Sequence, residues 1–273
     1  MKKWTGERLE TDIQNENTLE HLHRYAVAKN LVQNKIVLDI ASGEGYGSNL
    51  LAVGAKHVIG VDISSETIAE AKKKYLKQNL EYRVGSATEI PCEENYFDVV
   101  VSFETIEHHD KHEEMMQEIK RVLKPEGILI ISTPEKKYYS DKRNYKNPFH
   151  VKELTFDDFK KLLNKYFLFS EYLFQKCTFN SIIFSENENC NYKEYSGDYL
   201  NISQVSEPEY LYIIGLCSNV KLPAFQEVST FQNGDILDSM LIGNINSVKA
   251  GYRYRLGNLF IKPFSLLKRA FNI

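Results

Sequence analysis

The chain has 273 residues, of which 42% are hydrophobic and 26% charged, a composition typical of a soluble globular protein with one large domain or one domain with additions. Its formal net charge of −3 gives no overall attraction to nucleic acid, so no nucleic-acid partner is expected. No apolar stretch is long enough to span a membrane, and the first residues lack the apolar core of a signal peptide. The four cysteines are scattered without a CxxC pair, which favours reduced thiols and a cytoplasmic location.

Short apolar runs alternate with amphipathic segments along most of the chain. In chain order the patterns predict a helix at 17–32, a strand at 35–40, a helix at 48–55, a strand at 57–63, a helix at 64–79, strands at 80–86 and 97–103, a helix at 112–127, a strand at 127–133, a helix at 156–167 and late strands at 167–176 and 209–218. Near-continuous apolar strands that alternate with helices indicate a parallel sheet covered on both faces. Residues 177–208 are polar and rich in Asn and Glu, which predicts a surface insertion.

A glycine-rich turn, LDIASGEGYG at 38–47, follows the first strand. Glycine there lets the backbone approach a ligand closely, and the next helix offers free N–H groups. Asp62 ends the second strand, where a carboxylate can accept both hydroxyls of a ribose. A dinucleotide fingerprint needs a third glycine where this chain has Ser48, and Asp39, four residues before Gly43, suits an ammonium group better than a pyrophosphate. The pattern favours a ligand with a ribose and an amino-acid end over a plain turn whose glycines serve packing.

Four segments, VLDIASGEGYG, GVDIS, FDVVVSFETIEHH and RVLKPEGILIISTP, resemble successive motifs of class I S-adenosylmethionine-dependent methyltransferases over about residues 20–175. The resemblance implies an α/β fold: a Rossmann-like, doubly wound, mostly parallel seven-stranded sheet with an N-terminal lid helix in 1–32. The expected division is a methyltransferase domain at 1–218, with the insertion at 177–208, and a C-terminal extension at 219–273. Within the family the chain is similar to methyltransferases of bacterial surface-polysaccharide clusters and to ubiquinone-pathway O-methyltransferases.

The same resemblance implies a site for S-adenosyl-L-methionine. Asp39 and the turn after it would surround the methionine part, Asp62 would take the ribose hydroxyls, and Ile63 would pack on the adenine. Arg24 would face the cofactor carboxylate unless it lies on an ordinary surface face of the helix. Ser86 replaces the Asp that many relatives have for the exocyclic amine. The full set of predicted cofactor residues is Tyr25, Asp39, Ala41, Ser42, Gly43, Gly45, Asp62, Ile63, Ser86, Ala87 and Phe103.

The segment ETIEHH, 104–109, places two carboxylates and two imidazoles after a buried strand. In a helical turn Glu104, Glu107 and His108 would share one face. With His150 they would form a site for Mg²⁺ or Mn²⁺ that orients and acidifies an acceptor hydroxyl, as the ubiquinone-pathway likeness implies. The alternatives are metal-free base catalysis by His108 or His150, and a structural role in which Glu107 and His108 fix the loop. Glu107, His108 and His150 are therefore the candidate catalytic residues. No chemistry is assigned to His109, Asp110 and His112.

The acceptor is the least defined element. Basic and aromatic residues at 138–150 suit a phosphorylated or sugar-like acceptor, or an ordinary polar loop. The tail at 239–273 has no Asp or Glu and interleaves cations with apolar residues, so it could lie at the inner face of an anionic membrane, dock on a glycosyltransferase complex, or fold back on its own domain. The polysaccharide-cluster likeness suggests O-methylation of a sugar, a nucleotide-sugar or a phosphate-bearing group in cell-surface glycan synthesis. The alternatives are O- or N-methylation of a quinone or phosphorylated metabolite, an NAD-dependent nucleotide-sugar enzyme, and a non-enzymatic membrane adaptor.

Overall fold

The computed structural model describes most of the chain between residues 16 and 232. The described residues are 11, 16–178, 181–186, 192–197, 202–206, 208–222, 225, 228–232, 234, 242, 246 and 249–251. The basic apolar tail predicted at 239–273 therefore lies outside the described residues, apart from isolated positions.

Five α-helices, two short turns and eleven strands make up the described chain. The helices and turns are α1 (Glu16–Lys29), α2 (Tyr46–Leu51), α3 (Ser65–Lys74), the 3-10 turn η1 (Ile106–His108), α4 (His112–Val122), the π-helical turn η2 (Lys137–Asp141) and α5 (Phe156–Tyr166). The strands are β1 (Ile36–Ile40), β2 (His57–Asp62), β3 (Leu80–Val84), β4 (Phe97–Phe103), β5 (Leu123–Pro134), β6 (Phe169–Cys177), β7 (Ser181–Ser185), β8 (Tyr195–Gly197), β9 (Ile202–Gln204), β10 (Tyr212–Ser218) and β11 (Ser229–Phe231).

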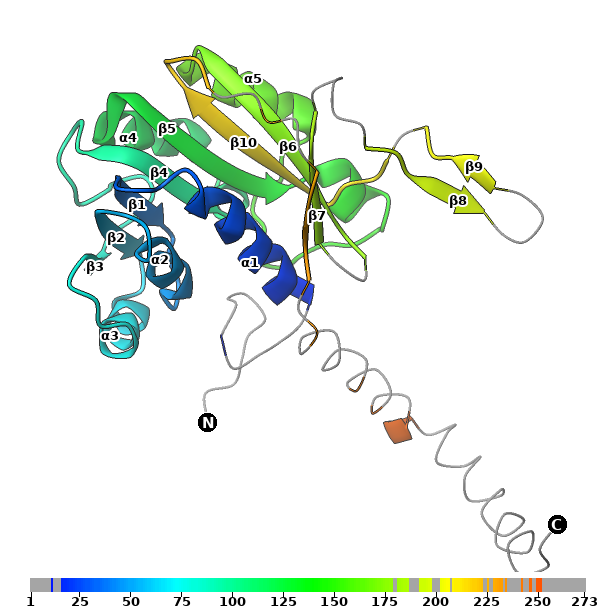
Figure 1. The fold of residues 1–273 in the computed structure, drawn as a ribbon, viewed down its shortest axis with the longest axis horizontal. Coiled ribbons are helices and arrows are strands. Elements are labelled where there is room, and N and C mark those ends of the chain that lie inside the picture. The colour runs from blue at the N-terminus through cyan, green and yellow to red at the C-terminus, as the bar shows by residue number, and fades with distance from the viewer. Residues whose placement is uncertain are drawn as a thin grey trace, which may run out of the picture.

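Among these residues the main sheet has nine strands in the order β11-β7-β6-β10-β5-β4-β1-β2-β3 (Figure 1). The five strands from β3 to β5 are parallel, as predicted. The remaining neighbours pair antiparallel, so the sheet is mixed. The expectation of a mostly parallel seven-stranded sheet is therefore wrong, because β7 and β11 extend the sheet beyond β6. These two strands come from the ranges predicted as the insertion and the C-terminal extension; the domain division itself stays a prediction.

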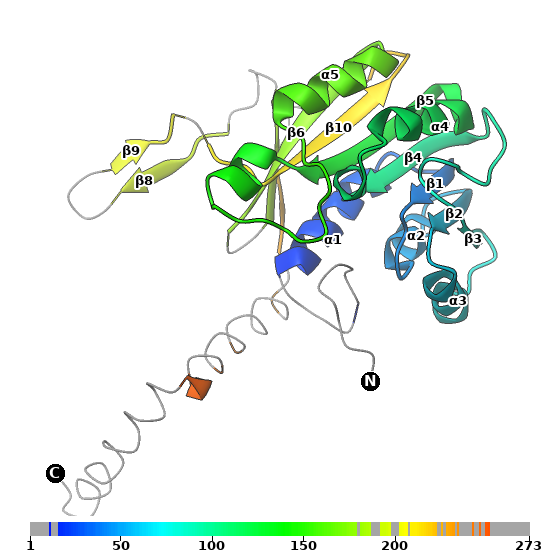
Figure 2. The same cartoon turned by 180° about the vertical axis from the view of Figure 1, so that it is seen from behind.

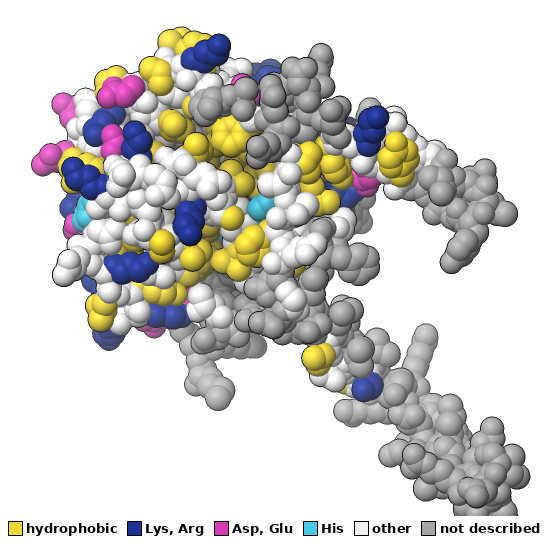
Figure 3. Space-filling model, in the orientation of Figure 1, with side chains coloured by type: hydrophobic (Ala, Val, Ile, Leu, Met, Phe, Trp, Pro, Cys, Tyr) yellow, Lys and Arg dark blue, Asp and Glu magenta, His cyan; other side chains and the backbone are white. Residues whose placement is uncertain are grey.

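Helices cover both faces of the sheet, which confirms the doubly wound α/β fold. Helices α4 and α5 lie on the face turned toward the viewer in Figure 2, and α1 and α2 lie on the opposite face. Strand β1 shows how the sequence creates two cores: Leu38 and Ile40 pack with α4 and α5, whereas Val37 packs with α1 and α2. This alternation follows from the two-residue period of a strand. In Figure 3, which has the orientation of Figure 1, hydrophobic side chains lie over the middle strands on the face that carries α1 and α2.

Most of the predicted elements are present, and two of those that flank the loop after β4 differ from the prediction. The helix expected at 112–127 ends at Val122, because Leu123 already pairs with Phe97 of β4 and Pro125 cannot continue a helix. The helical turn expected at 104–109 is shorter: only Ile106–His108 is helical, and Glu104 has the left-handed backbone angle φ 51°. Glu104 therefore does not share a helical face with Glu107 and His108, contrary to the prediction.

The strand order reverses between β1 and β4, because β2 and β3 continue to one side and β5 to the other. In such sheets a crevice opens at the carboxyl ends of the strands beside this reversal. Ile40, Val61 and Ser102 are aligned there by register, so the loops that follow β1, β2 and β4 start from one edge. No helix in the described part of the chain is both long and apolar enough to cross a membrane.

Candidate active site

A cavity of about 530 Å³ opens at this edge of the sheet, within the size range of small-molecule sites. Its walls come from α1, the turn after β1, the ends of β2 and β3, and the loop after β4. The predicted cofactor residues on the walls are Tyr25, Ala41, Ser42, Gly43, Asp62, Ile63, Ser86, Ala87 and Phe103. The structure thus brings most of the predicted set together, and their contact with a cofactor stays a prediction.

Asp39 lies behind the wall and supports it. The side chain is 1% exposed. Its carboxylate accepts hydrogen bonds from Ser48 Oγ at 2.6 Å and from the Tyr25 hydroxyl at 3.2 Å. Burial raises the pKa of Asp39 to about 6, although both hydrogen bonds oppose the rise. Asp39 therefore positions the Tyr25 ring, which lines the cavity.

Asp62 lies on the cavity wall at the end of β2. Its carboxylate accepts from the backbone N–H groups of Gly43 and Ser64, each at 2.9 Å. The neighbouring Ile63 is 70% exposed and lines the cavity, so a ligand in the cavity would bury its apolar surface. Ser86 hydrogen bonds with Thr88 on the same wall. An acid and an apolar platform therefore stand side by side, as a ribose joined to a base requires.

Gly45 lies one layer below the cavity. Its φ of 88° is in the left-handed region, and an added Cβ would lie 2.6 Å from the Tyr82 hydroxyl. That hydroxyl donates to the Gly45 carbonyl at 2.7 Å. Gly45 is thus needed for the turn and for Tyr82, whereas a Cβ on Gly43 would meet no atom within 4 Å. The open space over Gly43 is where a ligand can approach the backbone.

Arg24 does not face the cavity, contrary to the expectation. It is 1% exposed and donates to Gln175 Oε1 at 2.7 Å. Its guanidinium lies 4.7 Å from the Tyr212 ring centroid and 3.8 Å from Glu104 Oε1. Burial alone would lower the pKa of Arg24, but the charge of Glu104 leads the interactions that raise it instead. Glu104 also accepts from Ser132 Oγ at 2.6 Å, so its carboxylate is held between a strand hydroxyl and a buried cation.

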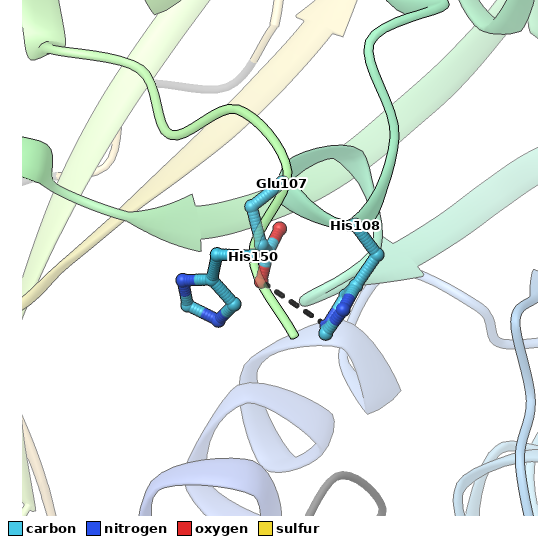
Figure 4. A group of neighbouring side chains, drawn as sticks. All are labelled: Glu107, His108 and His150. Atoms are coloured by element: carbon cyan, nitrogen blue, oxygen red, sulfur yellow. Dashed lines mark ion pairs between the residues drawn. The ribbon is translucent and has the colours of Figure 1, made fainter. Parts of the chain in front are cut away.

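Three of the four predicted metal ligands lie together. Glu107, His108 and His150 each offer a ligand atom, and these atoms are within 4.8 Å of one another; Figure 4 shows the Glu107 carboxylate beside His108 and His150. Glu107 is 1% exposed, and Thr133 Oγ1 donates to its Oε2 at 3.2 Å while Oε1 has no hydrogen-bond partner. Burial and then the charge of Glu104 raise the pKa of Glu107 well above its ordinary value. Glu104 is not part of this group.

The two imidazoles differ in what they can accept. His108 Nδ1 is 3.1 Å from the Phe149 carbonyl, which can only accept, so Nδ1 carries the proton and Nε2 the lone pair. His150 Nδ1 faces the Glu153 carboxylate at 2.5 Å, and its Nε2 is 3.0 Å from Asn147 Nδ2. An amide nitrogen can only donate, so it engages the lone pair of His150 Nε2. The lone pair of His150 Nε2 is therefore engaged by Asn147, and His108 Nε2 lies 4.0 Å from Glu107 Oε1.

Several wall residues were not predicted. They are Asn17 and His21 of α1, Glu44 of the turn after β1, Tyr46 at the start of α2, Gly85 and Thr88 after β3, and Thr105, His109, Asp110 and Lys111 after β4. His109 and Asp110, to which no chemistry was assigned, thus line the cavity, and whether they take part in chemistry stays untested. Helical spacing from Tyr25 would have pointed to His21, since they lie four residues apart on one face of α1.

Comparisons with known proteins agree with this geometry. Residues 38–131 match the family model described as a methyltransferase domain. The matched segment makes up about a third of the chain. Its first residue lies in β1 and its last in β5, so the domain match spans the parallel half of the sheet and the loops that form the cavity. The match agrees with the expected methyltransferase class, and the activity and cofactor of the whole protein stay predictions.

The relatives extend the methyltransferase likeness beyond the domain. A probable S-adenosylmethionine-dependent methyltransferase of Mycolicibacterium smegmatis is 35% identical over 162 residues, 58% of this chain and 62% of that protein. A ubiquinone biosynthesis O-methyltransferase of Haemophilus ducreyi is 31% identical over 106 residues, 36% of this chain and 45% of that protein. The YcgJ protein of Bacillus subtilis has the same fold, with a TM-score of 0.55 at 15% identity, over 74% of this chain and 100% of that one. The chain thus spans less than two thirds of the length of the curated relatives it matches.

Proposed function

We propose that the whole protein is an S-adenosylmethionine-dependent O-methyltransferase that methylates a sugar, a nucleotide-sugar or a phosphate-bearing group in cell-surface glycan synthesis. The observation that carries the proposal is the single cavity wall that joins Asp62 and Ile63 to Glu104 and His108. The first pair suits a nucleoside, and the second offers a carboxylate and an imidazole to a reacting hydroxyl. A ligand in this cavity would therefore have its nucleoside and its reactive end held by different strands.

The residues divide the work of methyl transfer between binding and proton removal. S-Adenosylmethionine, when bound, supplies an electrophilic methyl group, so the protein must align an acceptor oxygen and take its proton. His108 Nε2 carries the lone pair for that proton, because the Phe149 carbonyl holds the Nδ1 hydrogen. The buried Glu107 lies 4.0 Å from His108 Nε2; burial and Glu104 raise its pKa, and a positive charge on His108 would oppose that rise and favour the carboxylate.

The test of the cofactor site is calorimetry with S-adenosylhomocysteine. We expect binding by the unaltered protein, and a dissociation constant raised roughly ten- to a hundredfold in Asp62→Ala, since a hydrogen bond to a charged group contributes about 1.5–3 kcal/mol. Asp98→Ala is the matched control: Asp98 also accepts from a backbone N–H, that of Ile36 at 2.8 Å, but at the other end of the sheet. Absence of binding by the unaltered protein would refute the proposed function.

A divalent cation at Glu107, His108 and His150 is a second mechanism for the same reaction. The unpartnered Glu107 Oε1 and the His108 lone pair favour it. The engaged His150 Nε2 opposes it, because Asn147 would have to turn away. The cation would be Mg²⁺ or Mn²⁺, and it would lower the pKa of a coordinated acceptor hydroxyl.

Mn²⁺ binding can be followed by electron paramagnetic resonance without an acceptor. If the cation mechanism holds, Mn²⁺ is bound and displaced by Mg²⁺, and His150→Ala weakens the binding at least about tenfold while S-adenosylhomocysteine binding stays unchanged. Equal Mn²⁺ affinity in both proteins, or turnover that persists in excess EDTA, would leave His108 as a metal-free base.

A quinone is the alternative acceptor. The similarity to a ubiquinone biosynthesis O-methyltransferase favours it. The charge of the segment 136–152, beside His108 and His150, argues against it: the segment carries six Lys or Arg residues and one acid, Asp141. An apolar quinone ring gains little from such a field, whereas an anionic acceptor is attracted.

A further inference from the structure

Tyr139 lies at the acceptor side of the active site. Its ring stacks on His150, with centroids 5.4 Å apart and planes at 25°. Asn147 Nδ2 donates to its hydroxyl at 3.3 Å, so the ring is held by stacking on one face and by a hydrogen bond at its hydroxyl. Burial raises the pKa of Tyr139 to about 12, and the charges of Glu104 and Glu153 add to the rise. Tyr139 is therefore a neutral, fixed ring beside the residues proposed for chemistry.

Arg143 stands over this ring at the rim. Its guanidinium carbon is 5.9 Å from the Tyr139 centroid and 5.9 Å from the Tyr145 centroid. The two rings contact each other edge to face, 5.9 Å apart at 66°. Arg143 and Tyr145 are exposed, so the guanidinium keeps its donors toward solvent while two aromatic rings limit its freedom.

The charge of Arg143 has no acidic partner in the described part of the chain, where no carboxylate oxygen lies within 4.0 Å of it. Its neighbour Lys142 differs, since its ammonium pairs with Glu209 at 2.8 Å. The surrounding segment 136–152 has an excess of five positive charges, six cations against Asp141. A guanidinium that is oriented by two rings and has no carboxylate partner among the described residues is a site for an anion.

We propose that Arg143 binds a phosphate group of the acceptor, and that this contact selects a phosphorylated sugar over an uncharged acceptor. This rests on the proposed function, of which it specifies the substrate class. The planar fork of guanidinium donors matches two phosphate oxygens, and such charge-assisted pairs are about twice as strong as neutral hydrogen bonds. The edge of the Tyr145 ring beside it offers apolar surface to a sugar ring.

The geometry also sets the direction of the acceptor. Tyr139 contacts both Arg143 and His150, and His150 faces His108, which lines the cavity, with centroids 5.2 Å apart. A phosphate on Arg143 and a reacting oxygen at His108 would therefore be joined along this row of side chains. The methylated oxygen then belongs to the sugar, and the phosphate serves as the handle.

The experiment uses the full chain saturated with S-adenosylhomocysteine, and glucose 1-phosphate, inorganic phosphate and glucose as probes. ³¹P NMR titration gives the dissociation constants of the two phosphates, and saturation-transfer NMR detects glucose. We expect both phosphates to bind, glucose to bind more weakly than glucose 1-phosphate, and Arg143→Gln to weaken phosphate binding roughly five- to twentyfold. Arg143→Lys keeps the charge without the fork and should fall between the two.

Lys142→Gln is the matched control, because it removes the same charge one residue away from a side chain already paired with Glu209. It should change phosphate binding less than twofold. Equal weakening of phosphate binding by Lys142→Gln and Arg143→Gln would overturn the proposal in favour of a diffuse positive field. The proposal would also be overturned if glucose bound as tightly as glucose 1-phosphate, or if neither phosphate bound at millimolar concentration. Because S-adenosylhomocysteine binding is measured separately, its loss would refute the proposed function, whereas its retention without phosphate binding would refute only the role of Arg143.

Discussion

Single residues behind the cavity wall decide the shape of the site. Asp39 is the clearest case: it is almost fully buried, touches no cavity space, and is bonded to Tyr25 and Ser48. Burial disfavours its charge more than two hydroxyl donors favour it. The carboxylate is therefore a source of pH-dependent stability as well as a support for Tyr25.

Asp39→Asn should remove this pH dependence. The folded-state pKa of about 6 lies above the ordinary value of 3.8, so the folded protein keeps a proton that the unfolded chain releases. The contribution of Asp39 to the free energy of unfolding should therefore fall by up to about 3 kcal/mol as pH rises from about 4 to 6, and stay constant above that range. Urea unfolding of both proteins at several pH values measures it. A difference in stability that does not change across this range would show that Asp39 ionises normally.

At the scale of elements, α1 joins parts of the molecule that are far apart in sequence. Three consecutive residues, His23, Arg24 and Tyr25, are all buried. Tyr25 faces Asp39 at the cavity, and Arg24 reaches Glu104 and Gln175. A helix with so wide a buried face is enclosed on several sides, so its polar residues must find partners inside.

The Arg24–Glu104 pair should show this coupling in a double-mutant cycle. Glu104→Gln leaves a buried guanidinium without its carboxylate and should destabilise the protein by about 3 kcal/mol. Arg24→Met combined with Glu104→Gln removes both charges, so the double variant should be more stable than Glu104→Gln alone. Urea unfolding of the two single variants and the double variant measures the coupling free energy. Additive losses would mean that the 3.8 Å separation carries no significant interaction.

At the scale of the whole molecule, the imidazole of His23, on α1, contacts β7 and β11, the two strands that extend the sheet. His23 Nδ1 is 2.9 Å from Ser181 Oγ of β7, and its Nε2 is 3.1 Å from Ser229 Oγ of β11. Gln175 continues this polar chain from Ser181 to Arg24. The strands outside the matched segment 38–131 are thus connected to the loop after β4 through these hydrogen bonds and the Arg24–Glu104 ion pair.

His23→Gln should loosen these strands and change the acid sensitivity. Burial lowers the pKa of His23 from 6.5 to about 4, so unfolding takes up a proton between these values. The contribution of His23 to the free energy of unfolding should be fully present above about pH 6.5 and fall by roughly 3 kcal/mol as the pH is lowered to about 4. The variant His23→Gln should lack this pH-dependent contribution. Hydrogen exchange should become faster in 181–185 and 229–231 and remain unchanged in β1 and β2. Uniform acceleration would show that β7 and β11 do not open separately.

The parallel half of the fold could be predicted from sequence because its signals are local. Apolar strands, the glycine-rich turn and the acid at Asp62 are each readable within a few residues, and the cavity wall follows from the register of parallel strands. Strands β7 and β11 could not be predicted, because their pairing joins residues 181–185 to 229–231 across a polar stretch. Whether a metal binds stays a prediction; Glu104 lies outside the candidate group, because its left-handed backbone and its contacts with Ser132 and Arg24 join residues far apart in sequence. Arg24 was misplaced because a charged residue is rarely this deeply buried.

The exposure of Ile63 predicts a change in heat capacity when a ligand fills the cavity. In the structure 70% of this aliphatic side chain meets water, beside a carboxylate that is already hydrogen bonded to the backbone. A purine laid on it would remove apolar surface from hydration, which lowers the heat capacity of the complex. The enthalpy of nucleoside association should accordingly become more exothermic as temperature rises, and Ile63→Ser should flatten that slope.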